Sequence, residues 1–382
     1  MKIIIVGTAY PMRGGIAHYV ALLYQKLIQK GHDVTVLSFH RQYPKLLFPG
    51  KTQMDTGKEL FPVDSHPLLD SINPFSWIKA FFWIRMQKPD CLVFKYWMPF
   101  FAPCYATLIF LSRLFLKIPS IYICDNITPH ENHFLNRFLS WLGLLFVDGY
   151  IVQSKAVQDD LLSRKKAPVY QFVPHPIYEI FPEAISKEDA RKQLGIHEKK
   201  VILYFGYIRN YKGLKYIVQA MPDILKKQPV RLIVCGEFYE GEEEILDLIN
   251  KEKLHDSVTL VNEFIPNENV HLYFCAADLV VLPYVSATQS GIVQMAYYYD
   301  RPVLATDVGG LPEVVLNEKT GFIVPSKNSQ ALSDTVVKFY KNNMEPVFVK
   351  HILKEKEKYS WNHMTDAIEN LYQSIKGEKW SK

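Results

Sequence analysis

Residues 278–302 read DLVVLPYVSATQSGIVQMAYYYDRP, and three structural signals follow one another in this stretch. The apolar run Leu279–Leu282 predicts a buried strand, and the sequence from residue 291 onward predicts a helix. The turn between them contains Thr288, Gln289, Ser290 and Gly291. A polar turn at the start of a helix offers free backbone N–H groups to an anion.

A second strand-to-turn element lies upstream, at residues 205–213, FGYIRNYKG. Gly206 ends the predicted strand, and Arg209 and Lys212 place two cations three residues apart before a predicted helix. Arginine can form a fork across phosphate oxygens, and lysine supplies a mobile point charge. The alternative is a solvated basic turn. Together with the turn after residue 287, this element predicts a site for a nucleoside diphosphate.

The composition favours a globular protein of two domains. The chain has 382 residues, of which 48% are hydrophobic and 22% charged. Residues 1–175 carry 19 lysines and arginines against 11 acidic residues, a net charge of +8, whereas the remainder carries 25 against 28, a net of −3. The basic half is expected to meet an anionic partner such as a membrane surface or a phosphorylated acceptor. Random surface charge is the alternative.

The sequence shows no sign of export or of a membrane span. Five cysteines are scattered without a C-x-x-C pair or metal-like clustering, which favours a reducing, cytoplasmic location. The N-terminus predicts a first strand rather than a signal peptide. The longest apolar stretch, residues 96–111, contains two prolines and is shorter than the roughly 20 residues that a bilayer requires. A soluble or peripheral protein is therefore expected.

Short apolar runs alternate with helical patterns, which predicts a parallel α/β architecture. A proline-rich break at residues 173–182 separates two such series, and residues 41–67 predict a long loop with a short strand. We expect two facing Rossmann-like, doubly wound domains, at 1–175 and 176–345, followed by C-terminal helices at 346–382 that pack back toward the first domain. The predicted strands are 2–7, 33–38, 90–94, 119–124 and 149–153, then 201–206, 231–236, 258–261, 278–283, 302–306 and 321–324. The helices predicted in the first half are 15–30, 75–88, 102–116, 133–146 and 155–163.

The first βα turn, residues 7–16, lacks the G-x-G-x-x-G spacing of a nicotinamide dinucleotide fingerprint. Instead, Gly14 and Gly15 open the first helix, where they permit close approach of a ligand to the backbone. An ordinary pair of loop glycines is the alternative.

Other polar residues follow predicted strands. Asp125 and His130 lie after the strand that ends at Cys124, where they could position an acceptor hydroxyl or exchange a proton with it, or simply cap the next helix. Glu237 also follows a strand and is a candidate ligand contact. The aromatic stripe at 75–83 is expected in the core, with a membrane-facing role as the alternative.

Four motifs carry a resemblance to a known family: AYPMRGGIAHYV near the start, FGYIRNYKGL, CAADLVVLPY, and RPVLATDVGGLPEVV followed by TGFIVP. In this order and at these separations they resemble the retaining glycosyltransferases of family 4, which have the GT-B fold. The resemblance covers nearly the whole chain. It implies that the backbone of Gly15 and the N–H groups of Ser290 and Gly291 contact donor phosphate, and that Arg209 and Lys212 hold the diphosphate and stabilise the leaving group.

The sequence also departs from that family. Its members typically carry two glutamates eight residues apart around this loop, and counting back from Pro302 places them at Ala287 and Met295. No acidic residue occurs between Asp278 and Asp300, so the polar substitutes are Thr288, Gln289 and Gln294. The family's small glycine before Pro-Val is replaced by Asp300-Arg301, and Asp125 stands where its N-domain histidine is expected.

The expected activity is transfer of a sugar from a UDP-, GDP- or ADP-sugar to a hydroxyl acceptor, with retention of the anomeric configuration. The acceptor would be a glycan, a polysaccharide or a lipid-linked intermediate, at the inner face of an anionic membrane. No permanently bound cofactor, metal ion or nucleic acid is expected. Two alternatives remain open at this point: a non-catalytic nucleotide-sugar-binding subunit of a polysaccharide assembly system, and a nucleotide-sugar epimerase on the same fold.

Overall fold

The computed structural model describes residues 1–44, 52–55, 59, 62–127 and 134–379, with only the backbone described for Phe134, Glu378 and Lys379. The chain divides into two compact units. The first comprises Met1–Asp55, Phe61–Pro176 and Tyr359–Lys382, and the second comprises Thr56–Leu60 and Ile177–Lys358. Each unit contains one parallel sheet with its own hydrophobic core.

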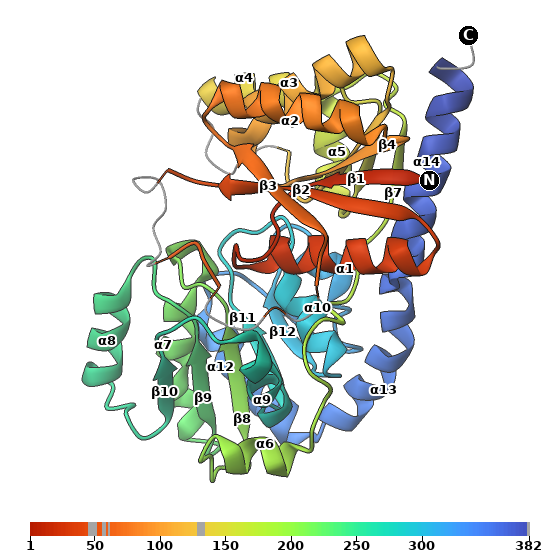
Figure 1. Ribbon diagram of the computed structural model, residues 1–382. Helices are drawn as coiled ribbons and strands as arrows, with labels where there is room; N and C mark the ends of the chain where they lie inside the picture. Colours follow the sequence, from red (N-terminus) through yellow and green to blue (C-terminus); the bar gives the residue numbers. More distant parts are fainter. Residues whose placement is uncertain (45–51, 56–58, 60–61, 128–133, 380–382) are drawn as a thin grey trace. The chain divides into compact units, whose positions relative to one another are not determined.

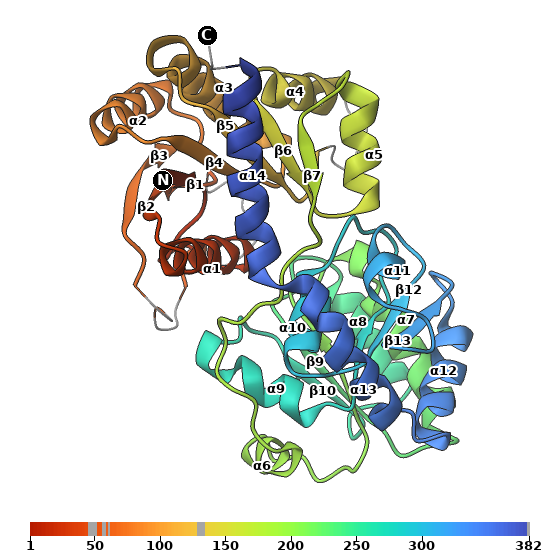
Figure 2. The same ribbon diagram turned by 90° about the vertical axis from the view of Figure 1, so that its right-hand side faces the viewer.

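The first unit has a seven-stranded parallel sheet in the order β3-β2-β1-β4-β5-β6-β7. Helices α2, α3 and α4 form a layer on one side of this sheet, while α1 lies on the other side (Figures 1 and 2). Because both faces are covered, the central strands are almost entirely buried and their sequences are almost continuously apolar. The strands are β1 (Lys2–Val6), β2 (Asp33–Arg41), β3 (Ser65–Asp70), β4 (Cys91–Tyr96), β5 (Ser120–Cys124), β6 (Gly149–Val152) and β7 (Tyr170–Phe172). The helices are α1 (Gly15–Gln29), α2 (Pro74–Gln87), η2 (Pro99–Phe101), α3 (Ala102–Leu111), η3 (Ser112–Leu116), α4 (Phe134–Leu144), α5 (Lys155–Arg164) and α14 (Trp361–Lys379).

The C-terminal helix α14 belongs to the first unit, although it is distant from the rest of that unit in sequence. It contacts α1 and β6. His32 Nε2 lies 2.8 Å from Glu369 Oε1, and Lys30 Nζ lies 2.5 Å from Glu369 Oε2. Gly149 in β6 leaves room for this helix, because a Cβ at that position would lie 2.7 Å from Cδ1 of Ile375. Packing and ion pairs together hold the last helix on this unit.

The second unit has a six-stranded parallel sheet in the order β10-β9-β8-β11-β12-β13. Helix α7 packs against both α8 and α12, and α6 packs against α9. The strands are β8 (Val201–Phe205), β9 (Arg231–Cys235), β10 (Val258–Val261), β11 (Leu279–Leu282), β12 (Val303–Thr306) and β13 (Gly321–Val324). The helices are α6 (Lys187–Gln193), η4 (Asn210–Lys212), α7 (Leu214–Leu225), α8 (Glu242–Lys251), η5 (Asn267–Asn269), α9 (Val270–Ala276), α10 (Gly291–Tyr298), α11 (Leu311–Val314), α12 (Ser329–Lys341) and α13 (Glu345–Glu355), after which η6 (Lys356–Tyr359) leads to α14.

The expected parallel α/β architecture with two Rossmann-like sheets is confirmed, and every predicted strand corresponds to an observed one. The structure adds β7, which the sequence pattern did not predict. The short strand expected within residues 41–67 corresponds only in part to β3, which begins at Ser65 and continues to Asp70. The helix predicted at 102–116 is instead α3 followed by the wider turn η3. Pro99–Leu116 is long and apolar enough to cross a membrane by length and composition alone, but half of it is buried inside the protein.

Candidate active site

In the second unit, the two elements singled out from the sequence meet at one edge of the sheet. Strand β8 pairs with β9 on one side and with β11 on the other, so the chain reverses its direction of winding between β8 and β11. Ligands of such sheets bind outside the carboxyl ends of the strands at this reversal. The loops after β8 and β11 both begin there, and the N–H of Val285 donates a 2.7 Å hydrogen bond to the carbonyl of Tyr211.

Two glycines in the loop after β8 are required by their surroundings. Gly213 has a φ of 67°, and a Cβ there would lie 2.0 Å from the carbonyl oxygen of Pro283. Gly206 has a φ of 106°, and a Cβ there would lie 3.3 Å from Nζ of Lys212. The first glycine permits the close approach of the two loops, and the second leaves room for the lysine side chain.

Arg209 and Lys212 form a pair of cations that lacks a protein counter-charge. Neither makes an ion pair with any residue in the described part of the chain. Burial, followed by repulsion from Arg209, lowers the pKa of Lys212 to about 8. The nearest aromatic contacts are the rings of Tyr284, 5.7 Å from Nζ of Lys212, and Tyr239, 5.1 Å from Cζ of Arg209. An anion bound here would supply the charge that the protein does not.

The turn before α10 has the local structure of a helix N-terminus with open donors. Ser290 caps the helix, and its Oγ accepts a 3.3 Å hydrogen bond from the N–H of Ile292. Within the described residues, no acceptor is found for the N–H groups of Ser290 and Gly291. These two groups are therefore available to an anion.

The glycine at position 291 has a packing explanation as well. A Cβ there would lie 2.9 Å from Cε2 of the buried Tyr178. The preceding residues are held by the loop after β12, because the N–H of Gly310 donates a 2.9 Å hydrogen bond to the carbonyl of Thr288. Neighbouring segments therefore fix this turn together with the Ser290 cap.

The positions at which the resemblance places the two glutamates are buried and apolar: Ala287 is 8% exposed and Met295 is 7% exposed. Gln294, beside Met295, is only 1% exposed, so a ligand could reach its side chain only after nearby packing changes. The carboxamide oxygen of Gln294 and the carboxamide nitrogen of Gln289 are both buried without a hydrogen-bond partner in the described structure. An unpaired buried polar atom costs about 1–3 kcal/mol, so these two side chains are candidates for pairing with ligand.

The loop after β9 also reaches this edge of the sheet. Glu237 is 3% exposed, and its carbonyl accepts a 2.9 Å hydrogen bond from the N–H of Ile208. Gly236 before it has a φ of 142°, and a Cβ there would lie 2.1 Å from the carbonyl oxygen of Gly206. The loop after β9 therefore supports the loop that carries Arg209 and Lys212.

The replacement of the family's glycine by Asp300 also has a structural explanation. Asp300 follows the C-terminus of α10 with a φ of 56°, a left-handed conformation that glycine adopts freely and aspartate adopts more readily than most residues. Its carboxylate lies 2.6 Å from Nζ of Lys356, and Arg301 Nη1 lies 3.2 Å from Glu345 Oε1. Both residues that replace the glycine at this turn, Asp300 and Arg301, therefore form ion pairs.

In the first unit, the sheet reverses its winding between β1 and β4. Gly14 has a φ of 108° at the N-cap of α1, and its carbonyl accepts hydrogen bonds from Ala17 and His18. The first turn of α1, which begins at Gly15, contains no acidic residue. The positive end of this helix therefore lies beside the reversal point, and the helix's own first turn carries no carboxylate.

A buried lysine at the end of β4 is the residue that the sequence analysis missed. Lys95 is fully buried, and its Nζ lies 2.5 Å from Oδ1 of Asp125 and 3.0 Å from Oε1 of Gln153. The ammonium also lies 3.4 Å from the ring centroid of Tyr19, whose hydroxyl accepts a 3.1 Å hydrogen bond from Gln153 Nε2. A carboxylate, an amide oxygen and an aromatic face therefore compensate this charge.

This network affects the neighbouring groups. Burial lowers the pKa of Lys95, and the attraction of Asp125 opposes that shift. The ring of His175 lies 5.1 Å from that of Tyr19, and burial together with repulsion from Lys95 lowers its pKa to about 4. His175 is thus neutral near pH 7.

The predicted candidate Asp125 is held by Lys95, and its side chain remains 20% exposed. His130, its predicted neighbour, lies outside the described residues. A signal for Lys95 was present in the sequence, because a single cation inside the apolar run CLVFKYW requires a counter-charge once the strand is buried. No group of three or more His, Cys, Asp or Glu side chains is arranged to hold a metal ion within the described residues.

Family models match both halves of the chain. The model described as Glycosyltransferase Family 4 matches residues 13–177, and the model described as Glycosyl transferases group 1 matches residues 199–342. A relative named as an uncharacterized glycosyltransferase, MJ1607 of Methanocaldococcus jannaschii, is 24% identical over 97% of this chain and 98% of its own.

Two further matches were found. The D-inositol 3-phosphate glycosyltransferase of Corynebacterium urealyticum is 28% identical, but the match spans 49% of this chain and about half of the relative, 46%. The crystal structure of Anabaena Alr3699/HepE in complex with UDP and glucose is similar in fold, with a TM-score of 0.72 and 17% identity over 98% of this chain and all of that one.

These findings do not favour the binding-subunit and epimerase alternatives. Two parallel sheets, each with polar loops at its reversal point, agree with the family matches on the two halves. The chain is a glycosyltransferase with the GT-B fold, whose first half matches the family 4 model and whose second half matches the group 1 model.

Proposed function

We propose that this glycosyltransferase takes its sugar from a nucleoside diphosphate sugar bound at the carboxyl edge of the second unit's sheet. The observation that carries the proposal is the pair Arg209 and Lys212, two cations at the reversal point that form no ion pair with any described residue. A diphosphate supplies the missing negative charge in a compact form that both cations can contact. The similar Anabaena structure, which is described as a complex with UDP and glucose, supports this choice.

The proposed roles follow from the geometry of the loops. The N–H groups of Ser290 and Gly291 would donate to phosphate oxygens, while Arg209 and Lys212 would neutralise the charge that develops as the bond between the sugar carbon and the diphosphate breaks. Fixed donors and cations stabilise such a charge without reorganising during the reaction. Gln289 and Gln294, with their unpaired amide atoms, are the proposed sugar or ribose contacts in place of glutamates.

We further propose that the first unit contributes the acceptor side and that the sugar is transferred with retention, as the resemblance implies. Gly14 and Gly15 would admit the ligand close to the start of α1. Asp125, whose carboxylate is held by Lys95 yet partly exposed, would accept a hydrogen bond from a hydroxyl group. The acceptor class is a glycan or a lipid-linked intermediate, and the anomeric configuration of the product, observed by NMR, tests retention.

A ligand-induced thermal shift is the first test of the donor site. A ligand at about 100 times its Kd stabilises the folded state by about 2.7 kcal/mol. We expect UDP, GDP or ADP, or one of their sugars, to raise the melting temperature of the wild-type protein and to raise that of Lys212→Ala much less.

The matched control for this test is Lys215→Ala. Lys215 lies one turn further along the same segment, and its Nζ is 3.2 Å from Glu244. This variant should respond to the nucleotide as the wild type does. Equal shifts in melting temperature for Lys212→Ala and the wild type would show that the diphosphate does not bind at this site.

A further inference from the structure

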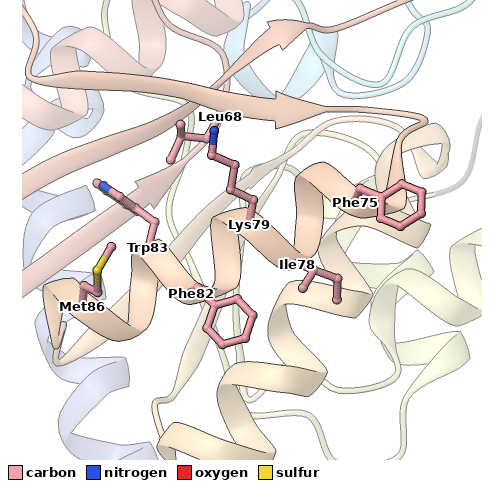
Figure 3. Close-up of a pocket in the computed structure, with 7 residues that line it drawn as sticks. All are labelled: Leu68, Phe75, Ile78, Lys79, Phe82, Trp83 and Met86. Carbon is pink, nitrogen blue, oxygen red and sulfur yellow. The ribbon is translucent and has the colours of Figure 1, made fainter.

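Helix α2 carries a stripe of large apolar side chains that faces solvent. Phe75, Ile78, Phe82 and Met86 follow one another at intervals of three or four residues, which places them along one side of the helix. Phe75 is 86% exposed and Met86 is 71% exposed. They line a shallow groove on α2 that also includes Trp83 and Leu68 of β3 (Figure 3). The prediction that residues 75–83 are core is therefore right for Trp77 and Phe81, but wrong for Phe75 and Phe82.

Two other segments of the same helical layer expose comparable residues. Leu114 and Phe115 of η3 are 56% and 65% exposed. Leu135, Phe138 and Trp141 repeat every three residues along α4, and Trp141 is 55% exposed. Helix α3 contacts α2, η3 and α4, so the three segments form one layer on one side of the first sheet (Figures 1 and 2). We call the exposed residues of α2, η3 and α4 the apolar face.

The segments that carry the apolar face hold charges of one sign. Residues 71–89, 91–124 and 134–147 contain no aspartate or glutamate. The same segments expose a set of cations, of which Arg113 is paired with Asp148, whereas the others form no ion pair with any described residue. The unpaired members are Lys79, Arg85, Lys88, Lys117 and Arg137.

We propose that the apolar face docks this transferase peripherally on an anionic lipid bilayer. Aromatic and aliphatic side chains at the headgroup level bury apolar area, and lysines and arginines near them are attracted to acidic lipids. Tryptophan, as at position 141, is enriched at this depth. A protein-binding patch would instead be depleted of lysine. The inference is independent of the donor, and it gives the basic first half an anionic partner.

Vesicle flotation tests the proposal directly. The full chain is incubated with vesicles of phosphatidylcholine alone and with vesicles of phosphatidylcholine and phosphatidylglycerol in equal parts. We expect binding to the mixed vesicles, much weaker binding to the neutral ones, and a loss of affinity as salt is raised, because salt screens the cations.

Two sets of variants separate the apolar and electrostatic parts. Phe75→Glu/Phe82→Glu should reduce binding to mixed vesicles at least about tenfold, because it removes apolar burial and adds repulsion. Lys79→Glu/Arg85→Glu should remove the preference for acidic lipid. Leu246→Glu, at a leucine of α8 that is 41% exposed, is the matched control and should bind as the wild type does.

All substituted positions are exposed, so folding is expected to survive, and circular dichroism checks it. Failure of the folded wild type to bind either vesicle would overturn the proposal, as would unchanged binding by the Phe75→Glu/Phe82→Glu variant. If light scattering instead showed an oligomer that the same variant dissociates, the face would be a protein interface and the bilayer assignment would be wrong.

Discussion

Lys95 and Lys212 occupy similar places in the two sheets, but the protein treats their charges in opposite ways. Each lies at the carboxyl edge of a parallel sheet near the strand where the winding reverses. Lys95 is enclosed by Asp125, Gln153 and the ring of Tyr19, whereas Lys212 forms no ion pair with any described residue and is repelled by Arg209. A compensated lysine stabilises and positions its partners, and an uncompensated one is available to a ligand.

The largest expected effect is on the free energy of unfolding, and it should occur on substitution of Lys95 but not of Lys212. Lys95→Met should lower the free energy of unfolding by about 3–5 kcal/mol, because it leaves a partly buried carboxylate without its partner. Lys212→Met should change it by less than about 1 kcal/mol, since no ion pair is lost. Urea denaturation of both variants measures the difference.

A double variant sharpens this prediction. If the cost arises from the unpaired Asp125, then Lys95→Met/Asp125→Asn should recover part of the lost stability. Equal destabilisation by the two lysine variants, or no recovery in the double variant, would contradict the distinction between the two sites.

The next effect concerns His175, whose pKa is lowered first by its burial and then by repulsion from Lys95. Its pKa of about 4 in the folded protein is below the usual 6.5, so the unfolded chain binds a proton first as the pH falls. Stability present above pH 6.5 is therefore lost as the pH falls toward 4, and this histidine accounts for about 2 kcal/mol between pH 8 and pH 5. His175→Gln should flatten the dependence of the urea midpoint on pH by this amount. An unchanged slope would show that His175 is protonated as an ordinary histidine.

A smaller effect is expected at the donor site. Lys212, with a pKa of about 8, is protonated below that pH and neutral above it. Affinity for a nucleotide sugar, whose diphosphate diester does not titrate in this range, should therefore fall up to about tenfold between pH 7 and pH 9. Calorimetry on the wild type and on Lys212→Met measures the slope, which the variant should lose. A slope that persists in the variant would assign the titration to another group.

The sequence was sufficient for the elements that repeat a strong pattern. Buried parallel strands are continuous apolar runs, so β1, β4, β5, β8 and β11 could be predicted from local sequence. The strand β7, YQF, has only three residues and becomes a strand by pairing with β6, which local sequence does not encode. The aspartate at position 300 is likewise explained only by the backbone φ of 56° there, which local sequence does not reveal.

Some residues of the candidate site could likewise be predicted from local sequence, and others could not. Arg209, Lys212 and the turn before α10 follow strands directly, so their position at the sheet edge could be inferred from spacing alone. Lys95 is 30 residues from Asp125 and 58 residues from Gln153 in the sequence. Only the order of the strands in the sheet brings these three side chains together. The packing of Tyr178 on Gly291 is equally non-local, and it gives that glycine a role beyond phosphate binding.

The most direct test of the open cation pair is sugar transfer itself. Transfer of labelled sugar from the nucleotide sugar that stabilises the protein should fall at least about tenfold in Lys212→Ala, because a charge contact to the leaving diphosphate is lost. Lys215→Ala should retain wild-type turnover. A folded Lys212→Ala protein that transfers sugar at the wild-type rate would contradict the assignment of this edge of the second sheet to the donor diphosphate.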